Sequence, residues 1–303
     1  MSDDAVLAIA RSVPGWESGD LDIEPLEGGI TNRNFIVTRE AERFVLRVPG
    51  RDTELLGIDR ANEARAATLA AEAGVGPPVV AFLPASGCFV TRFVEGVHIP
   101  ATDLRRDDVL GSVVRSLRRF HACAPVPSAF NVFRVVETYA ETAASRGVDP
   151  PRAYLDVHEL SDRIEAAVSV NASPLTTCHN DLLNANFLRD GDHTWIVDYE
   201  YAGMGDPFFD LGNLAVNNDL DAAADELLLT HAFGDVRDRH RARLALMRLM
   251  SDFREAMWAV VQQAISTLDM DFEAYAAKHL DRLLSNAAAA QLDELFEAAG
   301  EPA

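Results

Sequence analysis

The predicted fold depends most on one stretch, His179-Asn180-Asp181-Leu182-Leu183-Asn184-Ala185-Asn186. It follows the short apolar segment 175–178, and a second apolar segment, 194–197, ends directly before Asp198. Short apolar runs that stop at polar residues are typical of buried strands. The pattern therefore predicts a loop between two strands that presents an aspartate and an asparagine, with another carboxylate at the neighbouring strand end.

The order His-x-Asp-x-x-x-x-Asn in this loop matches the catalytic loop of kinases. Transfer of a phosphoryl group to a hydroxyl needs a carboxylate that accepts the hydroxyl proton, and Asp181 is the candidate base. It also needs oxygen ligands for a magnesium ion on the phosphates, and Asn186 and Asp198 are the candidate ligands. His179 is expected to support the loop rather than to exchange protons.

A glycine turn lies ahead of this loop, in Leu26-Glu27-Gly28-Gly29-Ile30-Thr31-Asn32. Apolar strands on both sides predict a hairpin, and backbone N–H groups at Gly28 and Gly29 could cover nucleotide phosphates. Thr31 and Asn32 could add side-chain donors. A plain hairpin turn with no bound phosphate is the alternative interpretation.

The next strand supplies the cation that a kinase needs at the α- and β-phosphates. The only lysine of the chain is Lys278, near the C-terminus, so Arg47 within the predicted strand 43–48 is the candidate. An arginine would contact the phosphates in a bidentate way. Glu63, on a helix predicted over Asp59–Ala73, could pair with Arg47. The alternatives are an exposed strand arginine and a glutamate on a solvated helix face.

The chain divides into a strand-rich part and a helix-rich part, with a boundary near Val94-Glu95-Gly96. Residues 1–95 are predicted to form a small nucleotide-binding lobe and residues 96–303 a larger catalytic and acceptor-binding lobe. The fold class is therefore α+β, with two lobes. The other predicted elements are strands at Val79–Leu83 and Cys88–Phe93, and helices at Val109–His121, Ala153–Val168 and most of Ala222–Ala299.

The composition narrows the range of partners. With 27 basic and 48 acidic residues the net charge is −21, which would repel nucleic acid and anionic membranes and favour a cationic small molecule, although acidity also aids solubility. The N-terminus lacks signal-peptide features, and no apolar run approaches twenty residues. The three cysteines form no metal or disulfide motif, so a cytoplasmic location is expected. The sequence does not predict an oligomeric state.

Three motifs, at residues 28–32, 179–186 and 198–201, resemble those of the choline/ethanolamine kinases, relatives of the aminoglycoside phosphotransferases. The resemblance spans about residues 23 to 284. It implies a bilobal, protein-kinase-like fold with ATP and Mg²⁺ as cofactors. It also implies that adenine bonds to backbone near Phe93 and Val94, and that Asp210 braces the catalytic loop.

A C-terminal motif of Trp258, Gln262, Ser266, Asp271 and Tyr275 also resembles this family. It implies a small cationic alcohol as acceptor, since aromatic faces bind quaternary ammonium groups well. Two positions depart from the family: Glu255 stands where many members have a tryptophan, and Asn217 where many have an acidic residue. The pocket residues expected from the resemblance are Glu200, Tyr201, Glu255, Trp258 and Tyr275.

Two other functions stay open at this point. The acceptor could be an aminoglycoside, thiamine or another sugar or alcohol, and polycationic aminoglycosides would suit the acidic chain. A nucleotide-binding protein without catalysis is disfavoured, because the candidate base Asp181 and both candidate metal ligands are present.

Overall fold

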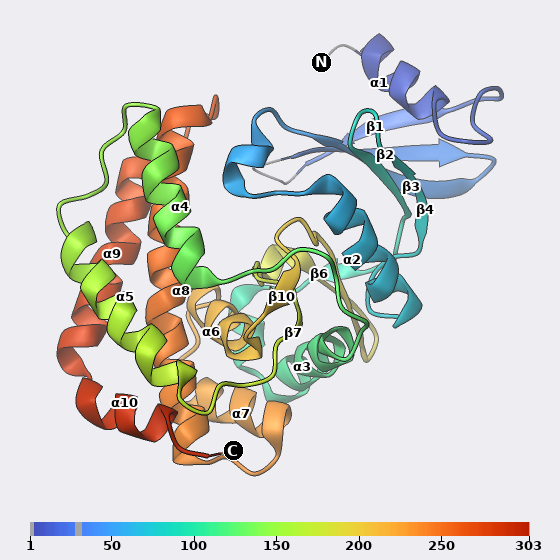
Figure 1. Cartoon of the computed structure of the whole chain (residues 1–303). Coiled ribbons are helices and arrows are strands. Elements are labelled where there is room, and N and C mark those ends of the chain that lie inside the picture. The colour runs from blue at the N-terminus through green and yellow to red at the C-terminus, as the bar shows by residue number, and fades with distance from the viewer. Residues whose placement is uncertain (1–2, 28–31, 303) are drawn as a thin grey trace.

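The computed structural model describes residues 3–27 and 32–302, and it divides into two lobes (Figure 1). Gly28, Gly29 and Thr31, predicted to cover the phosphates, lie outside the described residues. The strands on either side of them, β1 (Asp22–Leu26) and β2 (Asn32–Arg39), pair antiparallel, which confirms the predicted hairpin.

The N-terminal lobe is a five-stranded antiparallel sheet in the order β1-β2-β3-β5-β4. One face is covered by α1 (Asp3–Arg11), and the segment that follows it packs Val13 and Trp16 against the sheet. The sequence analysis did not predict α1. The remaining elements of this lobe are β3 (Glu42–Pro49), β4 (Val79–Leu83), β5 (Cys88–Arg92), the 3-10 helix η1 (Thr53–Leu56) and α2 (Arg60–Glu72).

Strand β3 sets the direction of Arg47. Phe44, Leu46 and Val48 are buried in the cluster beneath α1. Because successive strand residues point to opposite faces, Arg47 points to the other face of the sheet. It meets α2 there, and the side chain of Asp59 caps the first turn of α2.

The C-terminal lobe is mainly helical, with small sheets β6-β8-β9 and β7-β10 beneath the helices. In Figure 1, α4, α5, α8 and α9 lie side by side. The helices are α3 (Asp107–His121), α4 (Val132–Ser145), α5 (Tyr154–Ser169), α6 (Pro207–Asn217), α7 (Ala222–Phe233), α8 (Asp238–Ile265), α9 (Phe272–Ala289) and α10 (Leu292–Ala299). The other elements are β6 (Val97–His98), β7 (Thr176–Cys178), β8 (Phe187–Asp190), β9 (His193–Ile196), β10 (Gly203–Gly205), η2 (Ala101–Arg105) and η3 (Asn184–Asn186).

Helix α8 is the centre of this lobe. Its apolar residues at helical spacing, Leu246, Met250, Phe253 and Met257, are buried. In addition, every residue from Leu249 to Gln262 is buried, because α4, α6 and α9 pack around the helix. A helix buried on all sides forces any charged side chain on it to find a partner inside the protein. Within the described ranges, no helix is both long and apolar enough to cross a membrane.

Candidate active site

The loop after β7 is held by α6. Asp210, which is fully buried, accepts hydrogen bonds from the backbone N–H groups of His179 (2.9 Å) and Asn180 (2.6 Å). Its other neighbour is His121, whose Nε2 lies 2.8 Å from the Asp210 carboxylate. Burial alone would raise the pKa of Asp210, but the hydrogen bond and charge of His121 outweigh it, so this pKa is lowered. Asp210 therefore stays ionised and fixes the start of the loop, as the resemblance implied.

His179 supports the loop from within. Its Nε2 lies 3.0 Å from the carbonyl oxygen of Val197, and the N–H of Asp181 donates to its Nδ1 at 3.3 Å. Burial lowers the pKa of His179, which keeps the ring neutral. A neutral ring with the proton on Nε2 satisfies both contacts.

Two residues of the site, one in the loop and one after β9, have a left-handed backbone. Asn180 has φ 65° and Asp198 has φ 71°, a region that asparagine and aspartate tolerate better than most residues. The N–H of Val197 donates to the Asn186 carbonyl at 3.0 Å, so Asp198 follows directly beside Asn186. Asn186 Nδ2 donates to the Asp181 carbonyl at 2.9 Å. The candidate base and both candidate metal ligands thus come together.

The Asp181 carboxyl group is in a strongly perturbed environment. Burial raises its pKa, the nearby Arg254 lowers it and Glu255 raises it, with a net value of about 7. A carboxylate poised near neutral pH can accept a proton from a hydroxyl and release it again.

Arg47 links the two lobes at the predicted nucleotide side. It forms an ion pair with Glu63, as predicted, and its Nη2 lies 2.8 Å from Asp198 Oδ1. Burial opposes the charge of Arg47, but Asp198 and Glu63 outweigh it and raise the pKa. The arginine therefore stands beside one of the candidate metal ligands.

Glu200 lies with this nucleotide-side group rather than with the acceptor aromatics. Its Oε2 accepts from Asn32 Nδ2 at 2.8 Å and from Arg60 Nη1 at 3.2 Å. Burial raises the pKa of Glu200 to about 8. Arg60, which the sequence analysis did not single out, also pairs with Glu63 at 2.7 Å. Glu200 therefore joins the end of β9 to β2 and α2.

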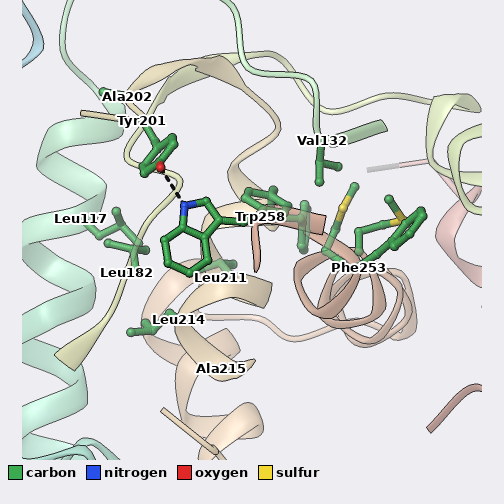
Figure 2. Close-up of a cluster of buried hydrophobic side chains, with 14 of the residues drawn as sticks. Leu117, Val132, Leu182, Tyr201, Ala202, Leu211, Leu214, Ala215, Phe253 and Trp258 are labelled. Carbon is green, nitrogen blue, oxygen red and sulfur yellow. Dashed lines mark hydrogen bonds between the residues drawn. The ribbon is translucent and has the colours of Figure 1, made fainter. Parts of the chain in front are cut away.

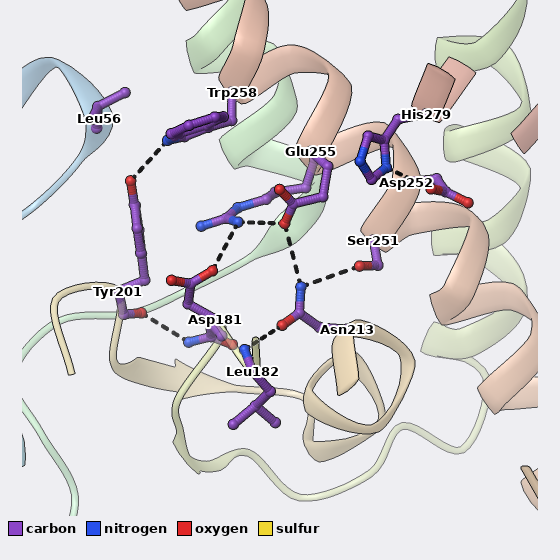
Figure 3. Close-up of polar contacts among 12 residues, drawn as sticks. Leu56, Asp181, Leu182, Tyr201, Asn213, Ser251, Asp252, Glu255, Trp258 and His279 are labelled. Carbon is purple, nitrogen blue, oxygen red and sulfur yellow. Dashed lines mark hydrogen bonds and ion pairs between the residues drawn. The ribbon is translucent and has the colours of Figure 1, made fainter. Parts of the chain in front are cut away.

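Figure 3 shows two of the predicted acceptor aromatics, Tyr201 and Trp258, joined by a hydrogen bond on the side of the site where Asp181 and Glu255 lie. Trp258 Nε1 donates to Tyr201 Oη at 3.1 Å, and the Trp258 and Tyr275 rings meet edge to face with centroids 5.9 Å apart. Tyr275 Oη donates to Glu255 Oε2 at 3.1 Å. Tyr201, Glu255, Trp258 and Tyr275 therefore form one group, here called the acceptor group. Figure 2 shows that Trp258 also borders the hydrophobic core.

The candidate base, the buried aspartate that holds its loop and the arginine between the lobes fit the expected phosphoryl transfer, and comparison with known proteins shows the family. A family model described as the phosphotransferase enzyme family matches residues 22–246. The chain belongs to this family. The phosphotransferase is 28% identical to ethanolamine kinase 2 of Rattus norvegicus, in an alignment that covers 90% of this chain and 78% of that protein.

Two further relatives of the phosphotransferase point the same way. It is 27% identical to the protein LicA of Haemophilus influenzae over 268 residues, with 84% of this chain and 76% of that one covered. A choline/ethanolamine kinase family protein from Mesorhizobium loti has a crystal structure that matches at a TM-score of 0.84 and 32% identity, over 99% of both chains. The predicted kinase-like fold and the resemblance are confirmed, and the chain is a small-molecule kinase.

Arg254, like Arg60, is a residue of the site that was not predicted from the sequence. Only 2% of its side chain is exposed, and its Nη1 lies 2.6 Å from Glu255 Oε1 and 3.4 Å from Asp181 Oδ1. Its guanidinium carbon lies 4.4 Å from the centroid of the Tyr201 ring. The signal that could have found it is its spacing from Trp258, four residues on, which places both on one face of α8.

Two asparagines hold the backbone of the loop residue that follows Asp181. Asn213 Oδ1 accepts from the N–H of Leu182 at 2.6 Å, and Asn213 Nδ2 lies 3.2 Å from Ser251 Oγ. Asn218 Nδ2 donates to the Leu182 carbonyl at 2.9 Å. The loop residue next to the candidate base is thus fixed on both sides by α6 and the residue after it.

The predicted adenine contacts lie in the connection between the lobes. Phe93 and Val94 fall between the end of β5 and the start of β6, close to the predicted boundary at residue 95. The N–H of Phe93 donates to the Arg43 carbonyl at 2.9 Å, and the Arg43 guanidinium covers the Phe93 ring at 4.1 Å. That N–H therefore already has a partner within the protein.

Replacement of the loop brace gives a first prediction. Asp210→Asn removes one of the two acceptors that face the N–H groups of His179 and Asn180, and sets an NH₂ group against a donor. We expect stability to fall by about 1–3 kcal/mol, since a buried donor loses its partner. We expect kcat to fall by about 10²-fold, since the loop shifts. Urea unfolding and steady-state kinetics measure the two effects, and unchanged kcat would contradict the bracing role.

Proposed function

We propose that this phosphotransferase transfers the γ-phosphoryl group of ATP, with Mg²⁺, to the hydroxyl of a small amino-alcohol of the choline or ethanolamine type. The observation that carries the proposal is the position of Asp181. The backbone carbonyl of Asp181 accepts a hydrogen bond from Asn186, which lies beside Asp198. The carboxylate of Asp181 contacts Arg254, at the edge of the acceptor group. The names of the relatives support the same acceptor class.

The side-chain chemistry of Asn186 and Asp198 fits a magnesium ion. Because Asn186 Nδ2 is engaged by the Asp181 carbonyl, the amide oxygen Oδ1 is turned away from that contact. Oδ1 and the Asp198 carboxylate are the hard oxygen donors that Mg²⁺ prefers together with phosphate oxygens and water. A bound magnesium ion would neutralise charge on the phosphates.

The residues of the chain would then act as follows. The acceptor hydroxyl would donate its hydrogen bond to the Asp181 carboxylate, which takes the proton as the hydroxyl oxygen bonds to the γ-phosphorus. The bond from that phosphorus to the β–γ bridging oxygen breaks, and ADP leaves with the electron pair. Arg47 would turn from Asp198 to the phosphates, where its two-nitrogen fork suits their oxygens.

An acceptor panel with ADP release as the readout tests this function. We expect turnover with ethanolamine, choline or a close amino-alcohol relative, and weak turnover with aminoglycosides, thiamine and simple sugars. ADP release without an acceptor gives the background. If every amino-alcohol in the panel were inert, the proposed acceptor class would be wrong.

The pH dependence of the reaction gives a second prediction. Asp181 must be ionised to accept the proton, and its pKa is raised to about 7. The rate therefore falls as pH drops through this value, and we expect the midpoint of kcat/KM to lie well above the ordinary aspartate pKa of about 3.9. Glu255→Gln should move the midpoint to lower pH, since the charge of Glu255 raises the pKa of Asp181. A midpoint near 4 in both proteins would contradict this role.

A further inference from the structure

The guanidinium of Arg254 has partners on one side only among the residues that the structure describes. Nη1 faces Glu255 and Asp181. Nε and Nη2 are buried and have no hydrogen-bond partner among the residues that the structure describes. These two nitrogens form one side of the planar group, the side that can bind a carboxylate through two parallel hydrogen bonds. Nε is also unpaired in several other arginines of the described residues, but Arg254 is the one among them in which Nη2 is unpaired as well, so a whole donor edge is left for an acceptor on a bound molecule.

The surroundings of Arg254 place this free edge on the acceptor side of the site. The guanidinium stacks on Tyr201, and its charge also acts on Tyr139 of α4. Tyr139 Oη donates to the Leu56 carbonyl at 3.0 Å, so η1 of the N-terminal lobe lies against this region. The nucleotide side has its own arginines, Arg47 and Arg60, which pair with a separate set of carboxylates.

Arg254 also contacts Tyr201 and Glu255, the two groups that the ammonium group of a plain amino-alcohol would need. Its position 4.4 Å from the Tyr201 centroid is within the range of a cation–π contact, so that ring face already has a cation. Both oxygens of Glu255 have partners, Oε1 in Arg254 and Oε2 in Tyr275. Choline or ethanolamine would find these groups engaged and would offer no oxygen beyond the reacting hydroxyl to the free edge of Arg254.

We propose that Arg254 is a specificity-determining residue that binds a carboxylate of the acceptor, so that the preferred substrate is a hydroxylated amino acid or betaine rather than a plain amino-alcohol. The inference rests on the proposed function and narrows its acceptor class. The hydroxyl would meet Asp181 and the carboxylate would meet Nε and Nη2 of Arg254. The ammonium group would lie toward the rings of Trp258 and Tyr275.

Two matched pairs of acceptors test the proposal. L-Serine is ethanolamine with a carboxylate added, and L-carnitine carries the trimethylammonium and hydroxyl groups of choline together with a carboxylate. We expect kcat/KM of the wild-type enzyme to be higher for the carboxylate member of at least one pair, by about tenfold or more, since a site built for a polar group rejects the analogue that lacks it.

Arg254→Lys separates the charge from the two-nitrogen edge. Lysine keeps a cation near Asp181 and Glu255 but loses the bidentate geometry, so we expect the ratio within the preferred pair to fall to about threefold or less. Arg243→Lys is the matched control, because Arg243 is another fully buried arginine of α8 that stacks on an aromatic ring, Phe208, and bonds to the Val168 carbonyl. This control should keep the wild-type ratio.

Each outcome decides the proposal. If ethanolamine and choline are the better substrates in both pairs, the carboxylate-binding role is wrong while the proposed function stands. If none of the four compounds is phosphorylated, the carboxylate-binding role is wrong, and the wider acceptor panel decides the proposed function. If Arg254→Lys lowers kcat/KM equally for both members of the preferred pair, Arg254 only positions Asp181 and Glu255. The wild-type ratios remain decisive even if the variant does not fold.

Discussion

Asp181→Asn is expected to lower kcat by about 10²–10⁴-fold, the range that a general base contributes. The amide keeps the shape of the side chain but cannot accept the hydroxyl proton. Arg254 would retain Glu255 at 2.6 Å, so the substitution does not leave the guanidinium without a partner. The phosphates would be held by Arg47 on β3, so the Kd of ATP should change by less than about threefold. Steady-state kinetics and a thermal-shift titration with Mg²⁺ and ATP measure the two quantities.

A matched control for this variant is Asp108→Asn on the surface of α3. Asp108 pairs with Arg189 at 3.1 Å and lies away from the site, so kcat should be unchanged. Activity of Asp181→Asn within about tenfold of the wild type would remove Asp181 from the role of base. Loss of ATP binding together with turnover would instead indicate that the substitution disrupts the whole loop.

The local parts of the site could be predicted from the sequence. The loop 179–186 and the strand that ends just before Asp198 depend on residues close together along the chain. The pairing of Arg47 with Glu63 joins residues only 16 apart, and the sequence analysis anticipated it. These contacts follow from strand alternation and from the first turn of the next helix, which are both visible as patterns.

Arg254 and Arg60 could not be predicted in the same way. A helix that carries Arg254-Glu255 in sequence looks solvated on that face, unless another helix is known to cover it. Helix α4 packs against α8 and covers that face, but α4 is not among the helices predicted from the sequence. Arg60 meets Glu200 across 140 residues. Both roles depend on tertiary packing, which desolvates the charges and thereby makes their pairing obligatory.

The Glu200 prediction shows the same limit. The motif 198–201 has Glu200 next to Tyr201, so both were expected at the acceptor. The backbone turn after Asp198 separates them: Glu200 faces Asn32 and Arg60, while Tyr201 faces Trp258 and Arg254. Neighbours in sequence thus contact different groups of residues.

Gly212→Ala is expected to be among the most destabilising single changes in the C-terminal lobe. Gly212 lies in α6, where a Cβ atom would stand 2.7 Å from the Met247 carbonyl carbon and 2.9 Å from the Arg248 amide nitrogen of α8. Neither backbone atom can move without separating the two helices. The helix preference of alanine over glycine would return at most about 1 kcal/mol, whereas overpacking costs about 1–3 kcal/mol and occasionally more. Urea unfolding measures the net loss, which Gly212→Val should increase.

Gly111→Ala in α3 is the matched control, because the added Cβ there would meet a side chain rather than backbone. A Cβ at Gly111 would also stand 2.7 Å from another atom, but that atom is Cε1 of the His231 ring, at the end of a partly exposed side chain. Such a ring can rotate away at the expense of its contact with Asp107. The helix preference is the same in both cases, so Gly111→Ala should be much the milder change. Because α6 also carries Asp210 and Asn213, loosening α6 from α8 in Gly212→Ala should lower kcat as well, and equal stability of the two variants would contradict the close α6–α8 contact.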